Sequence, residues 1–136
     1  DGERSALLVL GSVAGQGGQF GQKVAGVEAG KTYTFAALAR GVGGPVSAHL
    51  EIERPVRPWD RAVKAKDVTI PVDRWTELHV EFQVDRPFAE GWFAYVSCAQ
   101  EGARLRLDAL RLHEGDYVPG KTPEGAKNLL DEVGIR

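Results

Sequence analysis

The chain has 136 residues, the length of one domain with its own hydrophobic core. Its 17 basic and 19 acidic residues give a formal net charge of -2, with no sign of the basic face that nucleic acids bind. No apolar run approaches the roughly 20 residues needed to span a bilayer. Neither a nucleic-acid nor a membrane partner is therefore expected.

Four segments in the first half of the chain have strand character. They are the apolar run at residues 5–13 and the segments at residues 19–27, 31–40 and 46–53. In the third segment, Tyr33 and Phe35 share one side and Arg40 lies on the other. In the fourth, His49 and Glu51 face away from the apolar side.

The second half opens with the longest irregular stretch, residues 54–66, which holds Trp59. Further strands are predicted at residues 67–71, 75–84, 91–98 and 103–113. The clearest alternation lies at residues 75–84, where Glu77 and His79 face outward. In the last segment the alternation shifts by one residue near Asp108, which predicts a β-bulge.

This pattern predicts an all-β fold. The 17 glycines separate short strand-like runs, the composition of many strands joined by turns. No strand–helix rhythm is present, so a parallel sheet is not expected. We predict two antiparallel sheets packed as a β-sandwich over residues 1–115, with residues 116–136 as a linker or short helical tail. The predicted core consists of Tyr33, Phe35, Leu50, Ile52, Leu78, Val80, Phe82, Leu105, Leu107, Leu110 and Leu112.

Outward polar residues are the first candidates for a binding site. His49 lies beside Glu51, and His79 lies beside Glu77. If both strands belong to one sheet, these side chains form one polar ligand-binding face. The same residues also suit a solvated sheet face or a transition-metal site.

Enzyme motifs such as G-x-S-x-G and H-E-x-x-H are absent from the sequence. A carboxylate pair does occur in glycosidases, but these carboxylates are predicted on a sheet face with no deep pocket. The sequence therefore favours a chain that catalyses nothing by itself.

Aromatic side chains point to sugars, because an aromatic ring packs against the C–H face of a pyranose. Trp59 lies in a proline-flanked loop among charged residues, where it either binds a ligand or covers the edge of the core. In residues 91–98 both sides are apolar, and Phe93, Tyr95 and Ser97 are predicted outward, with Tyr95 as the candidate. Trp92 is a second candidate although its side resembles the core. Arg40 completes the candidate set as a polar contact for hydroxyl groups. Trp75 is predicted to cap the core.

Several ordered segments resemble one known family. Residues 29–35 (AGKTYTF) resemble the "aGktYtf" strand of carbohydrate-binding modules of the family 4/9/16/22 type. Residues 72–76 followed by Phe82 resemble the "W-x(n)-F" strand of that family, and residues 105–112 resemble its last strand, "yiDdvrl". Residues 4–9 are similar to its opening strand, so the resemblance covers residues 4–113.

The resemblance implies a galactose-binding-like jelly roll that binds polysaccharide or oligosaccharide without catalysis. It also implies a secreted, extracellular parent enzyme, a glycoside hydrolase or polysaccharide lyase, whose catalytic domain is linked to this module. Members often carry a structural Ca²⁺, and by position the candidate ligands are the Asp108 side chain and the Lys31 carbonyl. Residues 126–130 resemble the "NLL" that opens a following module.

Two other functions remain open at this stage. The sandwich could pack against a catalytic domain without binding glycan, in which case a partner covers its outward aromatic residues. It could also bind a protein or a cell surface, because this fold hosts many ligands. A flat apolar patch, in place of a polar face, would favour the second.

Overall fold

The computed structural model describes residues 6–10, 18–58, 60–86, 91–98, 103–120 and 122–130. All its regular elements are strands. They are β1 (Ala6–Leu10), β2 (Gly18–Val24), β3 (Tyr33–Gly41), β4 (Val46–Glu53), β5 (Arg61–Lys64), β6 (Val68–Ile70), β7 (Thr76–Phe82), β8 (Trp92–Cys98) and β9 (Ala103–Glu114). Among these residues no helix has the length and apolar character that a membrane crossing requires.

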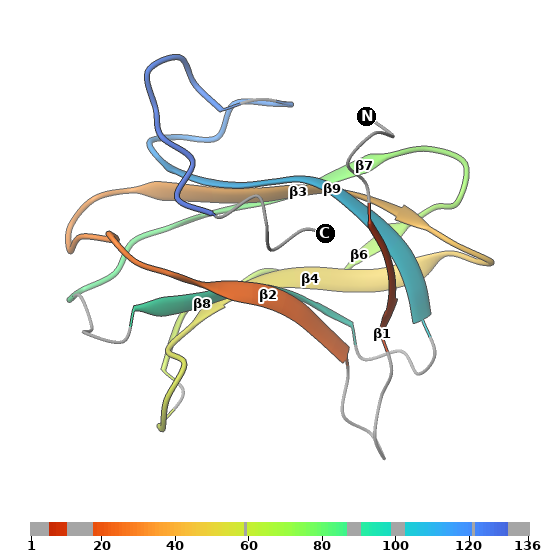
Figure 1. Ribbon diagram of the computed structural model, residues 1–136, viewed down its shortest axis with the longest axis horizontal. Coiled ribbons are helices and arrows are strands. Elements are labelled where there is room, and N and C mark those ends of the chain that lie inside the picture. Colours follow the sequence, from red (N-terminus) through yellow and green to blue (C-terminus); the bar gives the residue numbers. More distant parts are fainter. Residues whose placement is uncertain are drawn as a thin grey trace.

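The strands form two antiparallel sheets that face each other (Figure 1). One has four strands in the order β1-β9-β3-β7. The other has the order β2-β8-β4-β5, and β6 pairs with the first half of β4. Sheet neighbours are mostly distant in the chain, as in a jelly roll, and the predicted all-β sandwich is confirmed. β5 lies inside the stretch predicted to be irregular.

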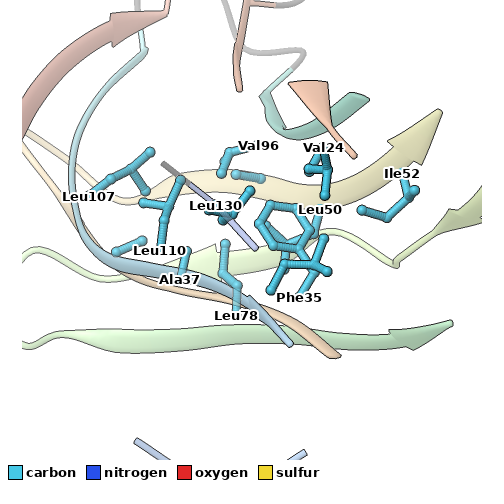
Figure 2. Close-up of a cluster of buried hydrophobic side chains, with 14 of the residues drawn as sticks. Val24, Phe35, Ala37, Leu50, Ile52, Leu78, Val96, Leu107, Leu110 and Leu130 are labelled. Atoms are coloured by element: carbon cyan, nitrogen blue, oxygen red, sulfur yellow. The ribbon is translucent and has the colours of Figure 1, made fainter. Parts of the chain in front are cut away.

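The core fills the space between the two sheets. Strand alternation places one side of each strand there, so that burial of apolar surface holds the layers together. Phe35 on β3, Leu50 on β4 and Leu107 on β9 are at most 1% exposed (Figure 2). Every predicted core residue belongs to this cluster or packs against it; Val80 is the member that is only partly buried.

The predicted bulge is present in β9. Between Ala36 and Leu38 the register of β3 shifts from Arg111 to Asp108, so β9 holds one extra residue there. Ala109 takes up this extra length with a φ of 51°, in the left-handed region. Its backbone N–H donates to Asp108 Oδ1 at 2.7 Å, which makes Asp108 part of the bulge.

The C-terminal segment is part of the sandwich, which differs from the predicted linker or helix. The Leu129 N–H donates to the Leu112 carbonyl at 2.7 Å. The Asn128 side chain accepts from the Leu112 N–H at 2.9 Å and donates to the Leu110 carbonyl at 3.2 Å. Leu130 is 6% exposed and lies among the core side chains (Figure 2). Residues 126–130 are not helical, because they pack along β9 and bond its backbone groups.

Candidate functional site

The outer face of the sheet β2-β8-β4-β5 carries a line of polar and aromatic residues. The register pairs Glu51 with Tyr95 and Glu53 with Phe93 across β4 and β8. Because Leu50 and Ile52 point into the core, the intervening Glu51 points the other way. The predicted side for Tyr95 agrees with this placement.

His49 and Glu51 are joined in one hydrogen-bonded network. The two ring nitrogens of His49 face Asp67 Oδ1 at 2.8 Å and Glu51 Oε2 at 2.6 Å. Both bonds form together only when both ring nitrogens carry hydrogen. Asp67 comes from the segment just before β6, so the β4–β6 pairing brings this carboxylate to the histidine.

Glu51 is the centre of the network, which we call the Glu51 cluster: His49, Glu51, Glu53, Arg61, Asp67 and Tyr95. Arg61 Nε donates to Glu51 Oε1 at 2.8 Å, and the Tyr95 hydroxyl lies 2.8 Å from the same oxygen. That hydroxyl also lies within hydrogen-bond distance of Glu53. A phenol carries one hydrogen, so Tyr95 donates to one carboxylate at a time.

The environment shifts two pKa values in the Glu51 cluster. Burial opposes ionisation of Glu51, but hydrogen bonds from His49 and Tyr95 and the charge of Arg61 outweigh it and lower its pKa. Burial and the two neighbouring carboxylates raise the pKa of Tyr95 far above its usual value. At neutral pH the site therefore presents a neutral phenol and an ionised Glu51.

We expect Glu51 to contribute to the pH dependence of stability. Its pKa is lower when folded than the unfolded value of about 4.3. Its contribution is therefore complete above that value and is lost as the pH falls through the folded pKa. Urea unfolding at pH values of about 6, 4 and 3 should show a smaller loss of stability in Glu51→Gln than in the unsubstituted chain. Glu28→Gln, at an exposed carboxylate, is the control, and parallel curves for all three chains would contradict this role.

One aromatic residue on this face is open to solvent. Phe93 is partly exposed, and its ring lies 5.2 Å from that of Tyr95. Tyr95 itself is only 1% exposed, so its ring offers no stacking surface here. Trp92 is 4% exposed and belongs to the core, so it too offers no such surface. Trp59 lies outside the described residues.

The remaining polar candidates lie on the other sheet. β7 carries Glu77 and His79, and it pairs with β3 instead of β4. Glu77 and His79 therefore do not share a face with His49 and Glu51, because the two strands belong to different sheets. Arg40, on β3, also faces outward from that second sheet.

A segment after β9 covers the candidates on β7. The ring of Tyr117 stacks on His79, with centroids 3.7 Å apart and planes 7° from parallel. Glu77 accepts hydrogen bonds from the Tyr117 hydroxyl, the Gly120 N–H and Arg111 Nη1. Arg111 in turn donates to the Val118 carbonyl at 2.7 Å. In Figure 1 this segment passes over the outer side of the sheet that contains β3 and β9.

The family of the chain follows from its sequence match. A family model described as a carbohydrate-binding domain matches residues 1–98. The chain belongs to this family. A carbohydrate-binding domain is a non-catalytic module that binds polysaccharide and is often linked to a catalytic domain. No curated protein matches the chain.

Solved carbohydrate-binding domains have the same fold. A CBM4 module matches with a TM-score of 0.68 and 18% identity, over 83% of this chain and 72% of that one. The CBM22-1 xylan-binding domain of Paenibacillus barcinonensis Xyn10C matches with a TM-score of 0.54 and 15% identity, over 87% and 85%. The N-terminal cellulose-binding domain of Cellulomonas fimi β-1,4-glucanase C matches with a TM-score of 0.54 and 16% identity, over 84% and 79%. At these identities the likeness concerns the fold.

The two calcium candidates of this carbohydrate-binding domain do not lie together. Asp108 is paired with Leu38 toward the end of β3, whereas Lys31 precedes the start of that strand. Leu38 lies five residues beyond the start of β3 at Tyr33, which separates the two levels by about 16 Å or more. The Asp108 carboxylate bonds the bulge backbone. Within the described ranges, no group of three or more His, Cys, Asp or Glu side chains is arranged to hold a metal ion.

Sequence reasoning placed Phe93 outward on the same side as Tyr95, as the structure has it, but did not select it as a site residue. It missed two other residues of this face. Arg61 and Asp67 carry no such signal. They reach the Glu51 cluster only because β5 and β6 pair with successive parts of β4.

Proposed function

We propose that this carbohydrate-binding domain holds a polysaccharide on the outer face of β2-β8-β4-β5. The observation that carries the proposal is the Glu51 cluster, with fixed carboxylate, imidazole and guanidinium groups beside the partly exposed ring of Phe93. This combination suits a sugar, because a pyranose presents C–H groups on its faces and hydroxyls around its rim.

Each part of the face has a chemical role in this proposal. Phe93 packs against one sugar ring. The exposed Lys23, which is paired with Phe93 across β2 and β8, donates to hydroxyls at one side. Arg61, whose side chain is 52% exposed, donates at the other. Tyr95 and the buried Glu51 are positioning residues, since the Tyr95 hydroxyl bonds Glu51 and Glu51 in turn holds Arg61. Glu53, which is partly exposed, is the carboxylate within reach of a sugar.

Gly21 on β2 leaves the surface next to Tyr95 without a side chain. A Cβ at Gly21 would lie 2.4 Å from Tyr95 Cβ, so no side chain can stand there. The missing side chain leaves a sugar access to the strip between β2 and β8. We therefore expect the polymer to run past Gly21 toward Phe93.

The expected affinity is modest. A wet, shallow face offers few desolvated contacts, which corresponds to dissociation constants on the order of micromolar to millimolar. Such binding is useful when the domain is tethered to a catalytic domain, because it raises the local concentration of enzyme at the polymer. We propose that the parent is a secreted glycoside hydrolase or polysaccharide lyase that acts outside the cell.

Affinity electrophoresis in gels containing xylan, cellulose derivatives or other neutral polysaccharides tests the proposal. We expect one polymer class to retard the chain, and we expect Phe93→Ala to remove most of that retardation. Val72→Ala, at an exposed apolar residue away from this face, is the control and should migrate as the unsubstituted chain does. The gels are run with Ca²⁺ and with chelator, because the family resemblance implies that ion.

Two results would contradict the proposal. If folded Phe93→Ala is retarded as strongly as the unsubstituted chain, the site lies elsewhere. If no polymer retards the chain, the domain is a structural sandwich that packs on its catalytic partner.

A further inference from the structure

The outer face of the sheet β1-β9-β3-β7 has two unlike halves. The half near Glu77 and Arg111 is covered by residues 115–120. The other half carries Arg40 on β3, with Arg106 directly opposite on β9. Arg104 lies two residues farther along β9 on the same side, next to the Gly43–Gly44 turn.

These residues, Arg40, Arg104 and Arg106, form what we call the arginine patch. Within the part of the chain that the structure describes, none of them is ion-paired with a carboxylate, whereas Arg111 on the same strand pairs with Glu77 at 2.8 Å. Asp108 lies on the same side of β9, but it is 5% exposed and accepts from the bulge backbone. Two like charges directly opposite each other destabilise a sheet. An anion bound between the guanidinium groups would relieve that repulsion.

An aromatic ring and an open turn border the arginine patch. The Arg40 guanidinium carbon lies 6.0 Å from the centroid of the Trp75 ring. Trp75 is partly exposed and lies outside the core cluster, so it does not have the capping role predicted from the sequence. A Cβ at Gly43 would lie 3.1 Å from Arg104 Nη2, so a larger residue there would press on the guanidinium. Gly43 also has a φ of 79°, which favours glycine.

We propose that the arginine patch and Trp75 form a second binding site, for an anionic polysaccharide with carboxylate or sulfate groups. The planar guanidinium fork matches both groups with paired hydrogen bonds. Neighbouring strands lie about 5 Å apart and alternate residues about 7 Å apart, so the patch offers several cations to one charged chain. Trp75 supplies the apolar surface for a sugar ring.

This second site is independent of the proposed polysaccharide face. The two lie on opposite sheets, so a neutral and an anionic polymer can bind at the same time. The proposed face is lined by the carboxylates of Glu51 and Glu53, which repel an anionic polymer. An anionic polymer therefore distinguishes the two sites.

The experiment is affinity electrophoresis with a polyuronate in one gel and a sulfated polysaccharide in another. Each guanidinium contributes a charge-assisted bond, so we expect Arg40→Gln/Arg106→Gln to weaken retention on the order of tenfold or more. Lys66→Gln/Lys127→Gln removes two exposed charges elsewhere and should weaken it less than about twofold. Trp75→Ala should weaken retention by the polymer, and thermal melting checks that each variant is folded.

The outcomes distinguish carboxylate from sulfate groups, and a polysaccharide from other polyanions. Retention in the uronate gel only, or in the sulfate gel only, identifies the anionic group. An equal loss in the arginine and lysine variants, or equal binding of duplex DNA and anionic vesicles, would overturn a saccharide site. So would absence of retention by both polymers. If neutral polymers fail to bind while the anionic arm behaves as expected, the proposed face falls and the arginine patch stands.

Discussion

Replacing Leu130 by alanine should lower the free energy of unfolding by about 2–5 kcal/mol. Leu130 is 6% exposed and lies among the core side chains, although it is only six residues from the end of the sequence given. Its truncation leaves a cavity between the sheets, and rigid strands close such a cavity only in part. Urea unfolding monitored by tryptophan fluorescence measures the change.

The matched control is Lys127→Ala, three residues earlier and exposed. It should change stability by less than about 0.5 kcal/mol. Equal effects at Leu130 and Lys127 would mean that the segment does not dock on β9. Asn128→Ala supplies a second check, because it leaves the Leu112 N–H and Leu110 carbonyl without their partner at a cost of about 1–3 kcal/mol.

Replacing Glu77 by alanine should cost about 3–5 kcal/mol of stability and leave polysaccharide binding per folded molecule unchanged. The side chain of Arg111 is 6% exposed and that of Glu77 is 13% exposed. Among the described residues Arg111 pairs with no other carboxylate, so removal of Glu77 leaves a buried guanidinium without its counter-charge. The Tyr117 hydroxyl and the Gly120 N–H also lose their acceptor. Calorimetry and affinity electrophoresis on the same samples separate the two effects.

The same contacts determine how the stability loss in Glu77→Ala depends on pH. Burial opposes ionisation of Glu77, but bonds from Tyr117, Gly120 and Arg111 lower its pKa below the usual value. Burial and the Glu77 carboxylate raise the pKa of Tyr117 to about 12. The difference between Glu77→Ala and the unsubstituted chain should therefore be full at neutral pH and shrink as the pH falls through the folded pKa of Glu77.

Glu81→Ala is the control for this prediction. Glu81 is exposed, and among the described residues it accepts one hydrogen bond, from the Tyr117 N–H at 2.8 Å. Removal of its side chain should therefore lower the free energy of unfolding by less than about 1 kcal/mol. A marked loss of polysaccharide binding in folded Glu77→Ala would instead assign the binding site to this sheet. That result would restore the role suggested for Glu77 and His79 by their outward pattern.

Much of the fold was predictable because its signals are local. Period-two alternation in β3, β4 and β7 identified Phe35, Leu50 and Leu78 as core residues, and the shifted phase in β9 identified its bulge. Burial of one side of each strand produces these patterns directly. Outward direction was equally predictable, as His49 and His79 both point away from the core.

Which outward residues share a face was not predictable, because strand pairing is a long-range property. His49 and His79 have the same local pattern, yet β4 and β7 belong to opposite sheets. The pairing of β6 with β4 brings Asp67 to His49, although the two lie eighteen residues apart. The composition of a single strand does not indicate which distant strand it pairs with, because that depends on how the intervening loops close.

The sequence alone determined every strand except β5, the buried side of the strands that alternate clearly, and the resemblance to carbohydrate-binding modules, since alternation and motif spacing are local features of the chain. Only the tertiary structure decided that the C-terminal segment packs along β9 and buries Leu130. It also divided the outward charges between a face centred on Glu51 and an arginine patch on the opposite sheet. The physical reason is that burial depends on the side chain itself, whereas a binding face depends on which distant backbones exchange hydrogen bonds.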